Sequence, residues 1–316
     1  MKKKRVLVTG ASGFIGKPLV TALLRAGYAV RAVTRRQFTF PNEVETTIIS
    51  DLRDFNDWNP ILQGVDIVIH LAGLAHAHAA DGDYDQINTV ATQKLVQAAK
   101  SVELDRFVFF SSVRAQTGAT AERLVREQDE ARPTNAYGRS KFAAEQMIRN
   151  GGVPFTILRP VVMYGPNPKG NMKSLTRLAK LPVPLPIASL TSRRSLLGID
   201  NAISAIIFAL KNPMTVDETF LLADPLPMTI GEILTALRRK PGRSMMNVYF
   251  PQSIIRVLLT LGGRKDIWLR FSGDLVVDTS KFESLGWRPI MSTAEGLLKM
   301  YHLGGSTRDT MIDHTM

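Results

Sequence analysis

Residues 6–16, VLVTGASGFIG, constrain the fold of this chain more than any other segment. Three glycines, Gly10, Gly13 and Gly16, follow a β-branched run and precede leucines at helical spacing. A glycine turn between a buried strand and a helix lets the backbone approach a pyrophosphate, which the first amides of the helix can bind. The segment therefore predicts a dinucleotide-binding strand–turn–helix unit.

Strand and helix patterns alternate through the first half of the chain. Short β-branched or aromatic runs occur at 6–9, 29–34, 46–50, 67–71 and 107–111, and a helical pattern covers 88–102. Repeated βα units of this kind predict an α/β fold, a Rossmann-type doubly wound parallel sheet with ligand at the carboxyl ends of its strands.

The sequence pattern changes near residue 164, where prolines cluster and the predicted helices and strands become short. We expect residues 1–163 to form the dinucleotide domain and residues 164–303 to form mainly a smaller C-terminal substrate lobe. A segment near 195–224 is expected to rejoin the first domain, although the strand–helix pattern over 219–223 and 229–237 favours the lobe. Residues 304–316 are polar and patternless, and we expect them to be disordered.

Composition excludes several classes of function. The chain has no cysteine, which excludes disulfides, thiolate catalysis and cysteine-based zinc sites and fits a cytoplasmic protein. It has no apolar run long enough for a transmembrane helix, and the segment after MKKKR lacks the apolar region of a signal peptide. The net charge of +12 indicates an anionic partner, but its cations are too scattered to predict a nucleic-acid surface.

A second constellation carries the chemistry. Tyr137 and Lys141 are four residues apart and share a helix face, and Ser111 and Ser112 end a predicted strand. A phenol titrates near pH 10, so an adjacent ammonium that favours phenolate makes a tyrosine usable as a proton donor and acceptor near neutrality. With a serine to bind the reacting oxygen, the pattern predicts a hydride-transfer site.

Eight motifs in this order resemble the extended short-chain dehydrogenase/reductase family, in particular its nucleotide-sugar epimerase/dehydratase branch. They are TGASGFIG, SDLRD, HLAG, FVFFSS, YGRSK, ILRPVVMYGP, RRSLLGIDN and SKFESLGW. The resemblance implies a catalytic set of Tyr137 as general acid or base, Lys141 on the nicotinamide ribose, where it lowers the tyrosine pKa, and Ser112 on the substrate oxygen. It also implies cofactor contacts from Gly10, Gly13, Phe14, Ile15, Gly16, Asp51, Leu52, Ala72, Gly73 and Pro160.

The chain departs from the family pattern just after the second serine. Sugar 4-epimerases often carry the catalytic hydroxyl one residue later, where this chain has Val113, and the usual V-Y-G reads Gln116-Thr117-Gly118. Ser112 is kept as the catalytic serine, with Ser111 as the alternative.

The cofactor prediction depends on the end of the second strand. An acidic residue there would bond the ribose 2′-hydroxyl, whereas this chain has Arg35 and Arg36 after Thr34. Since a guanidinium fork suits a phosphate, NADP is favoured over NAD.

The resemblance also implies the substrate side of the site. Arg194 and Arg270 match positions that grip the diphosphate of a UDP-sugar, and Asn171 matches a substrate-contacting amide. His76 and His78 lack a third ligand nearby, so no metal site is expected. Residues 253–261, with Arg264, Lys265 and Trp268 beyond them, allow a peripheral membrane contact, although packing in the lobe is favoured. A homodimer is common in the family.

Three functions remain open on the sequence. The favoured one, by a small margin, is an NADPH-dependent 4-ketoreductase acting at the 4-position of a UDP-hexose or UDP-N-acetylhexosamine, because of Arg35 and Arg36. A 4-epimerase with recycled NAD is the alternative, and a non-catalytic dinucleotide sensor or assembly subunit is a third.

Overall fold

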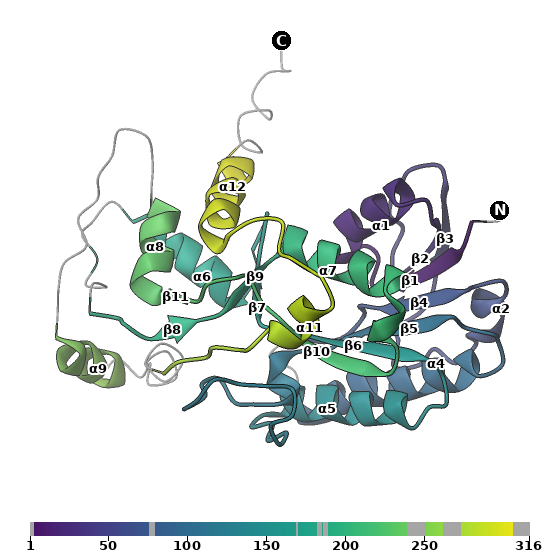
Figure 1. Ribbon diagram of the computed structural model, residues 1–316, viewed down its shortest axis with the longest axis horizontal. Helices are drawn as coiled ribbons and strands as arrows, with labels where there is room; N and C mark the ends of the chain where they lie inside the picture. Colours follow the sequence, from purple (N-terminus) through teal and green to yellow (C-terminus); the bar gives the residue numbers. More distant parts are fainter. Residues whose placement is uncertain are drawn as a thin grey trace, which may run out of the picture.

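The computed structural model describes residues 3–75, 80–168, 170–181, 185, 189–238, 251–261 and 273–305. Its centre is a parallel sheet of seven strands in the order β10-β6-β5-β4-β1-β2-β3 (Figure 1). The strands are β1 (Arg5–Thr9), β2 (Ala29–Thr34), β3 (Val44–Ile48), β4 (Ile67–His70), β5 (Arg106–Phe110), β6 (Phe155–Pro160) and β10 (Glu218–Leu222). The predicted doubly wound α/β sheet is confirmed, and the five predicted strands are all present.

Helices cover both faces of the sheet. On one face, α1 (Gly16–Arg25) and α7 (Ile199–Lys211) pack on β1 residues such as Val6 and Val8. On the other, α2 (Asn59–Leu62), α4 (Ala91–Ala99) and α5 (Ala136–Arg149) pack on residues such as Phe107 and Phe109. Every residue of β5 is buried, as expected for a parallel strand that is covered twice.

Shorter elements connect these layers. The predicted helix over 88–102 begins earlier, as α3 (Asp81–Tyr84) and a π-helical stretch η1 (Asp85–Val90), before α4 continues it. The 3₁₀ turns η2 (Val113–Ala115) and η3 (Pro213–Thr215) follow β5 and α7, and α11 (Ser280–Ser284) packs Phe282 against the sheet.

A second lobe lies beside the sheet, at the left of Figure 1. Its core joins α6 (Gly170–Ala179), α8 (Ile230–Arg238) and α12 (Thr293–Gly305) through residues such as Leu175, Leu234 and Leu297. Two small sheets pair β7 (Val162–Tyr164) with β9 (Leu196–Gly198) and β8 (Arg193–Arg194) with β11 (Met228–Thr229). Helix α9 (Gln252–Leu261) also belongs to this end of the molecule.

The placement of the strand over 219–223 in the lobe was wrong. This strand, β10, pairs with β6 and ends the main sheet, and only the helix after it lies in the lobe. Local pattern identified a strand but not its partner, which lies about 60 residues earlier. At this edge the Glu127 carboxylate accepts a hydrogen bond of 2.8 Å from the Leu221 amide.

The end of the chain also differs from expectation in part. Helix α12 continues to Gly305, so the first two residues of the expected disordered tail are helical. Residues 306–316 lie outside the described part of the chain.

Candidate active site

The glycine turn lies between β1 and α1, at the carboxyl end of the sheet. Gly10 has φ of 68°, and a Cβ there would lie 2.9 Å from the Ala72 amide nitrogen. A Cβ on Gly16 would lie 2.3 Å from the Gly10 carbonyl oxygen. No side chain caps the start of α1. A glycine-rich turn below an uncapped helix start fits the pyrophosphate of a dinucleotide, and Phe14 and Ile15 lie within that turn.

A buried hydrogen-bond chain links this turn to α5. The Ala72 amide donates to Thr9 Oγ1 (3.2 Å), which contacts His70 Nδ1 (2.7 Å). His70 Nε2 contacts Thr92 Oγ1 (3.0 Å), whose proton goes to the Asn88 carbonyl (2.7 Å). Because the Thr92 hydroxyl proton is used there, His70 must donate from Nε2, and Thr9 donates to Nδ1.

This chain fixes the loop after β4. Burial lowers the pKa of His70 to about 3, with a smaller contribution from Lys141, so the ring stays neutral. The Asn88 side chain bonds both backbone groups of Leu74 and lies against Gly73, and it also donates to Ser140 Oγ. Ala72 and Gly73 are thus held at the carboxyl end of β4, next to the glycine turn. Neither His70 nor Asn88 was predicted from the sequence, although the histidine of HLAG, at the end of a predicted strand, was a signal.

Helix α5 brings the proposed catalytic residues together. It begins after Asn135, whose side chain accepts a 2.8 Å bond from the Gly138 amide. Tyr137 and Lys141 follow one turn apart, and Ser112 lies close enough to Tyr137 to lower the pKa of its phenol. The Ser111 hydroxyl instead donates to Glu145 Oε1, which favours Ser112 over Ser111 as the serine beside the tyrosine.

The pKa values differ from the sequence expectation. Burial raises the pKa of Tyr137, although the Ser112 hydrogen bond and the charge of Arg114 oppose this. Lys141 donates to the Phe110 carbonyl (2.8 Å) and lies 4.0 Å from the centre of the Phe109 ring. Burial lowers its own pKa to about 7. Burial is thus the largest cause of the pKa shift of each group in this structure, and Lys141 is not among the causes that shift the Tyr137 pKa.

The residues predicted to hold the adenosine follow the neighbouring strand β2, at the same carboxyl end of the sheet as the glycine turn. Arg35 and Arg36 follow β2 and are exposed, and Arg35 forms an ion pair with Asp51 (3.2 Å). The Arg53 amide and the Arg35 guanidinium lower the pKa of Asp51. Leu52 is buried beside this pair. The two arginines thus follow β2 at the carboxyl end of the sheet, and one of them has a carboxylate partner.

The structure describes some of the residues predicted on the substrate side of the site, but not all of them. Pro160 ends β6 in the buried sheet, and Arg194 lies on β8, where its Nη1 donates to the Ala119 carbonyl (2.6 Å). Burial lowers the pKa of Arg194, and the charge of Arg114 adds to this, so the two guanidiniums are close. Asn171 lies in the first turn of α6. Arg270, His76, His78, Arg264, Lys265 and Trp268 lie outside the described residues.

Two features of the described residues bear on membrane and metal partners. Among the described helices, none is long and apolar enough to cross a membrane. Within the same ranges, no group of three or more acidic, histidine or cysteine side chains is arranged to hold a metal. Helix α9 exposes Ile254, Val257 and Leu261, which is the apolar face behind the predicted membrane contact.

The chain is similar to a protein family, to several curated proteins and to solved structures. The model described as the NAD dependent epimerase/dehydratase family matches residues 6–223. The chain is 30% identical to the UDP-glucose 4-epimerase of Vibrio cholerae over 308 residues, 93% of each chain. It is 27% identical to a ceramide reductase of Caulobacter vibrioides over 66% of this chain and 62% of that one. A structure of UDP-glucuronic acid 4-epimerase from Bacillus cereus in complex with NAD shares the fold, with a TM-score of 0.77 at 23% identity over 96% and 99% of the two chains.

Proposed function

The chain belongs to the NAD dependent epimerase/dehydratase family of extended short-chain dehydrogenases/reductases, and we propose that it is a UDP-hexose or UDP-N-acetylhexosamine 4-epimerase. Family membership makes it an NAD(P)-dependent enzyme and leaves the non-catalytic sensor without support. The observation that carries the proposal is the placement of Tyr137 one helical turn before Lys141, with Ser112 nearby, in a chain similar to a 4-epimerase over almost its whole length.

The side chains around Tyr137 fit proton transfer at a sugar hydroxyl. A bound nicotinamide would supply the hydride acceptor and donor. Tyr137 takes the proton of the 4-hydroxyl during oxidation and returns it during reduction, and Ser112 orients the same oxygen. Lys141 holds the nicotinamide ribose, and Arg194 binds the diphosphate together with the Arg270 position.

A second candidate is an NADPH-dependent 4-ketoreductase acting on the same class of sugar. It is favoured by Arg35 and Arg36, which replace the acidic residue that bonds a ribose 2′-hydroxyl. The similarity to the ceramide reductase covers only part of both chains, so it supports reduction more weakly than the full-length match supports epimerisation. For this reason the epimerase is placed first, reversing the small preference based on sequence alone.

One incubation separates the two candidates. The purified protein is given UDP-glucose, UDP-N-acetylglucosamine or a UDP-4-keto-6-deoxy sugar, with and without added NAD or NADPH, and products are separated by chromatography. Interconversion of 4-epimers without net change in reduced cofactor supports the epimerase. Stoichiometric NADPH consumption with the keto sugar alone supports the reductase.

A matched variant tests the assignment of the tyrosine. Tyr137→Phe removes the proton-transferring hydroxyl and should lower kcat by about 10²–10⁴ fold while leaving dinucleotide affinity unchanged. Full turnover by this variant contradicts the proposed site, whichever sugar is the substrate.

A further inference from the structure

A buried ion pair lies directly behind the proposed catalytic residues. Glu145, one turn after Lys141 on α5, accepts from Arg159 Nε (2.9 Å) and Nη2 (2.5 Å). Arg159 lies on β6, and the two side chains are 0% and 4% exposed. The pair therefore fastens the catalytic helix to the sheet through two parallel charge-assisted hydrogen bonds.

Gln116 extends this pair towards the substrate side. Its Oε1 accepts from Arg159 Nη1 (2.7 Å), and its Nε2 donates to the carbonyls of Asp129 (3.1 Å) and Arg126. The side chain is 2% exposed, at a position where the family pattern has an apolar valine. A buried amide is costly unless its polar atoms are bonded, and here both the oxygen and the nitrogen have partners.

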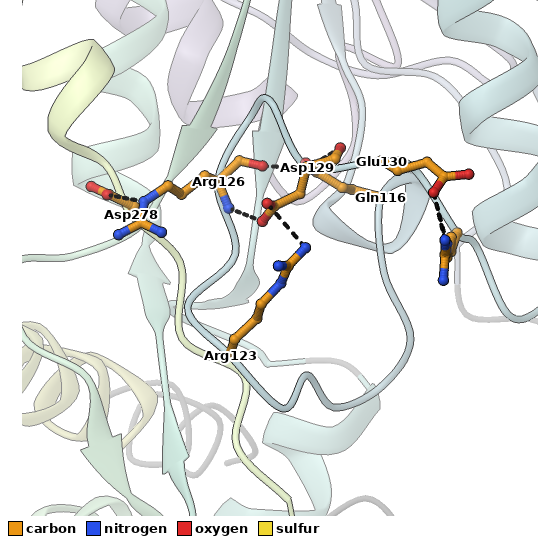
Figure 2. A network of polar contacts seen from close by, with 7 residues as sticks. Gln116, Arg123, Arg126, Asp129, Glu130 and Asp278 are labelled. Carbon is orange, nitrogen blue, oxygen red and sulfur yellow. Dashed lines mark hydrogen bonds and ion pairs between the residues drawn. The ribbon is translucent and has the colours of Figure 1, made fainter.

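The bonds from Gln116 end in the 116–134 loop, the segment between η2 and α5. Figure 2 shows the Arg126 side chain paired with Asp278, which lies in the segment before α11. It also shows the Asp129 carboxylate directed towards Arg123 and the Arg126 amide. The loop also joins residues 274–278 by backbone bonds, from the Ala121 amide to the Asp274 carbonyl (2.7 Å) and from the Val125 amide to the Val276 carbonyl (3.0 Å).

The same loop contacts the proposed diphosphate residue. Its Ala119 carbonyl accepts from Arg194, and Arg194 pairs by a β-bridge with Leu275 in the segment that the loop holds. A continuous path of hydrogen bonds therefore runs from α5 through Glu145, Arg159 and Gln116 to the loop that holds Arg194.

We propose that Gln116 is a positioning residue that couples the catalytic helix to the 116–134 loop and so sets the affinity of the site for the nucleotide diphosphate of its substrate. Its side chain is buried, and its amide oxygen and nitrogen are both bonded to protein atoms. Its amide group holds the loop backbone at a fixed distance from the Glu145–Arg159 pair, and Arg194 is held in turn by that loop. The substrate part of the proposal rests on the proposed function, whereas the coupling itself does not.

Two substitutions distinguish the role of the Gln116 amide oxygen, which accepts from Arg159, from that of its nitrogen, which donates to the loop. Gln116→Met has similar length and removes every hydrogen bond, whereas Gln116→Glu keeps an acceptor for Arg159 but turns a carboxylate towards the loop carbonyls. Both should raise KM for the UDP-sugar, and the dissociation constant for UDP in calorimetry, by about tenfold, with kcat within about threefold of wild type. Gln116→Glu should also lower the unfolding midpoint, because its second carboxylate oxygen faces the carbonyls of Arg126 and Asp129 without a donor, and the control variant separates this loss of stability from the loss of affinity.

Thr156→Val is the matched control. Thr156 is also buried on β6, accepts from Arg106 (2.8 Å) and donates to the Thr215 carbonyl (2.7 Å), but it lies away from the loop. This variant should lose stability with KM and UDP affinity unchanged. If Gln116→Met behaves in the same way, Gln116 is a structural residue only and the proposal is overturned.

Amide hydrogen exchange tests the coupling between Gln116 and the 116–134 loop without any substrate. The amides of Ala121, Val125 and Arg132, all bonded in or from the loop, should exchange faster in both Gln116 variants than in wild type and the control. Faster exchange combined with no turnover of any UDP-sugar by wild type would leave the coupling standing and reject the proposed function. Unchanged exchange in both variants rejects the coupling.

Discussion

Replacing Lys141 by methionine would measure the consequence of burying an ammonium at this site. Burial lowers the pKa of Lys141 from 10.5 to about 7 in the folded protein, whereas the unfolded chain keeps the ordinary value. Between these two values the unfolded chain binds one proton more than the folded chain. The free energy of unfolding of the wild type therefore rises with pH through this window, by a little over 1 kcal/mol per pH unit at most.

The methionine variant lacks this proton and should show no such rise. From pH 7 to pH 9 the wild type should gain about 2–3 kcal/mol relative to Lys141→Met. The variant also loses the bond to the Phe110 carbonyl, but that loss of about 1 kcal/mol does not depend on pH and only offsets the two curves. The pH dependence of the difference, rather than its absolute value, carries the prediction.

The assay is urea unfolding at pH 7, 8 and 9 on protein freed of dinucleotide, with Lys100→Met as the control. Lys100 is exposed at the end of α4, so its replacement controls for the loss of a lysine at the surface. Parallel curves for wild type and Lys141→Met across this range refute the reasoning, because they would mean that Lys141 has the same pKa in the folded and unfolded chains.

Three further outcomes follow from the structure. Replacing both Arg35 and Arg36 by alanine should weaken NADP binding by at least about tenfold and leave NAD binding almost unchanged in calorimetry, and equal losses would contradict the 2′-phosphate assignment. Gly10→Ala should cost at least about 1 kcal/mol in urea unfolding and abolish dinucleotide binding, because φ is 68° and the new Cβ would meet the Ala72 backbone; normal binding would count against the turn as the cofactor site. Phe282→Ala should cost about 3–5 kcal/mol, since the ring is fully buried against Phe220 and Trp287, with activity per folded molecule retained; a loss below about 1 kcal/mol would contradict this packing.

The sequence was informative where structure depends on neighbours along the chain. The glycine turn, the strand runs and the one-turn spacing of Tyr137 and Lys141 are local patterns, and the structure contains each of them. Spacing shows that Tyr137 and Lys141 share a face, whereas their pKa values in this structure depend on how deeply each is buried.

Features that depend on distant partners were also missed. The strand β10 was recognised, but its pairing with β6 could not be read from its own residues. Arg35 lies 16 residues before its partner Asp51, and Gln116 lies 43 residues before Arg159. A glutamine in place of an apolar family residue was the one available signal for the network around it, and it became meaningful only once its partners were known.

The contact between Glu127 and the edge strand β10 has a consequence for the association of this protein with other copies of itself. The outer strand of an open sheet presents unpaired amides, on which a strand from another chain can align. Here the Leu221 amide at that edge is occupied by a carboxylate from the 116–134 loop. Releasing the loop would therefore uncover a template for intermolecular strand addition, so mutations that loosen substrate binding through this loop should also make the protein prone to aggregate.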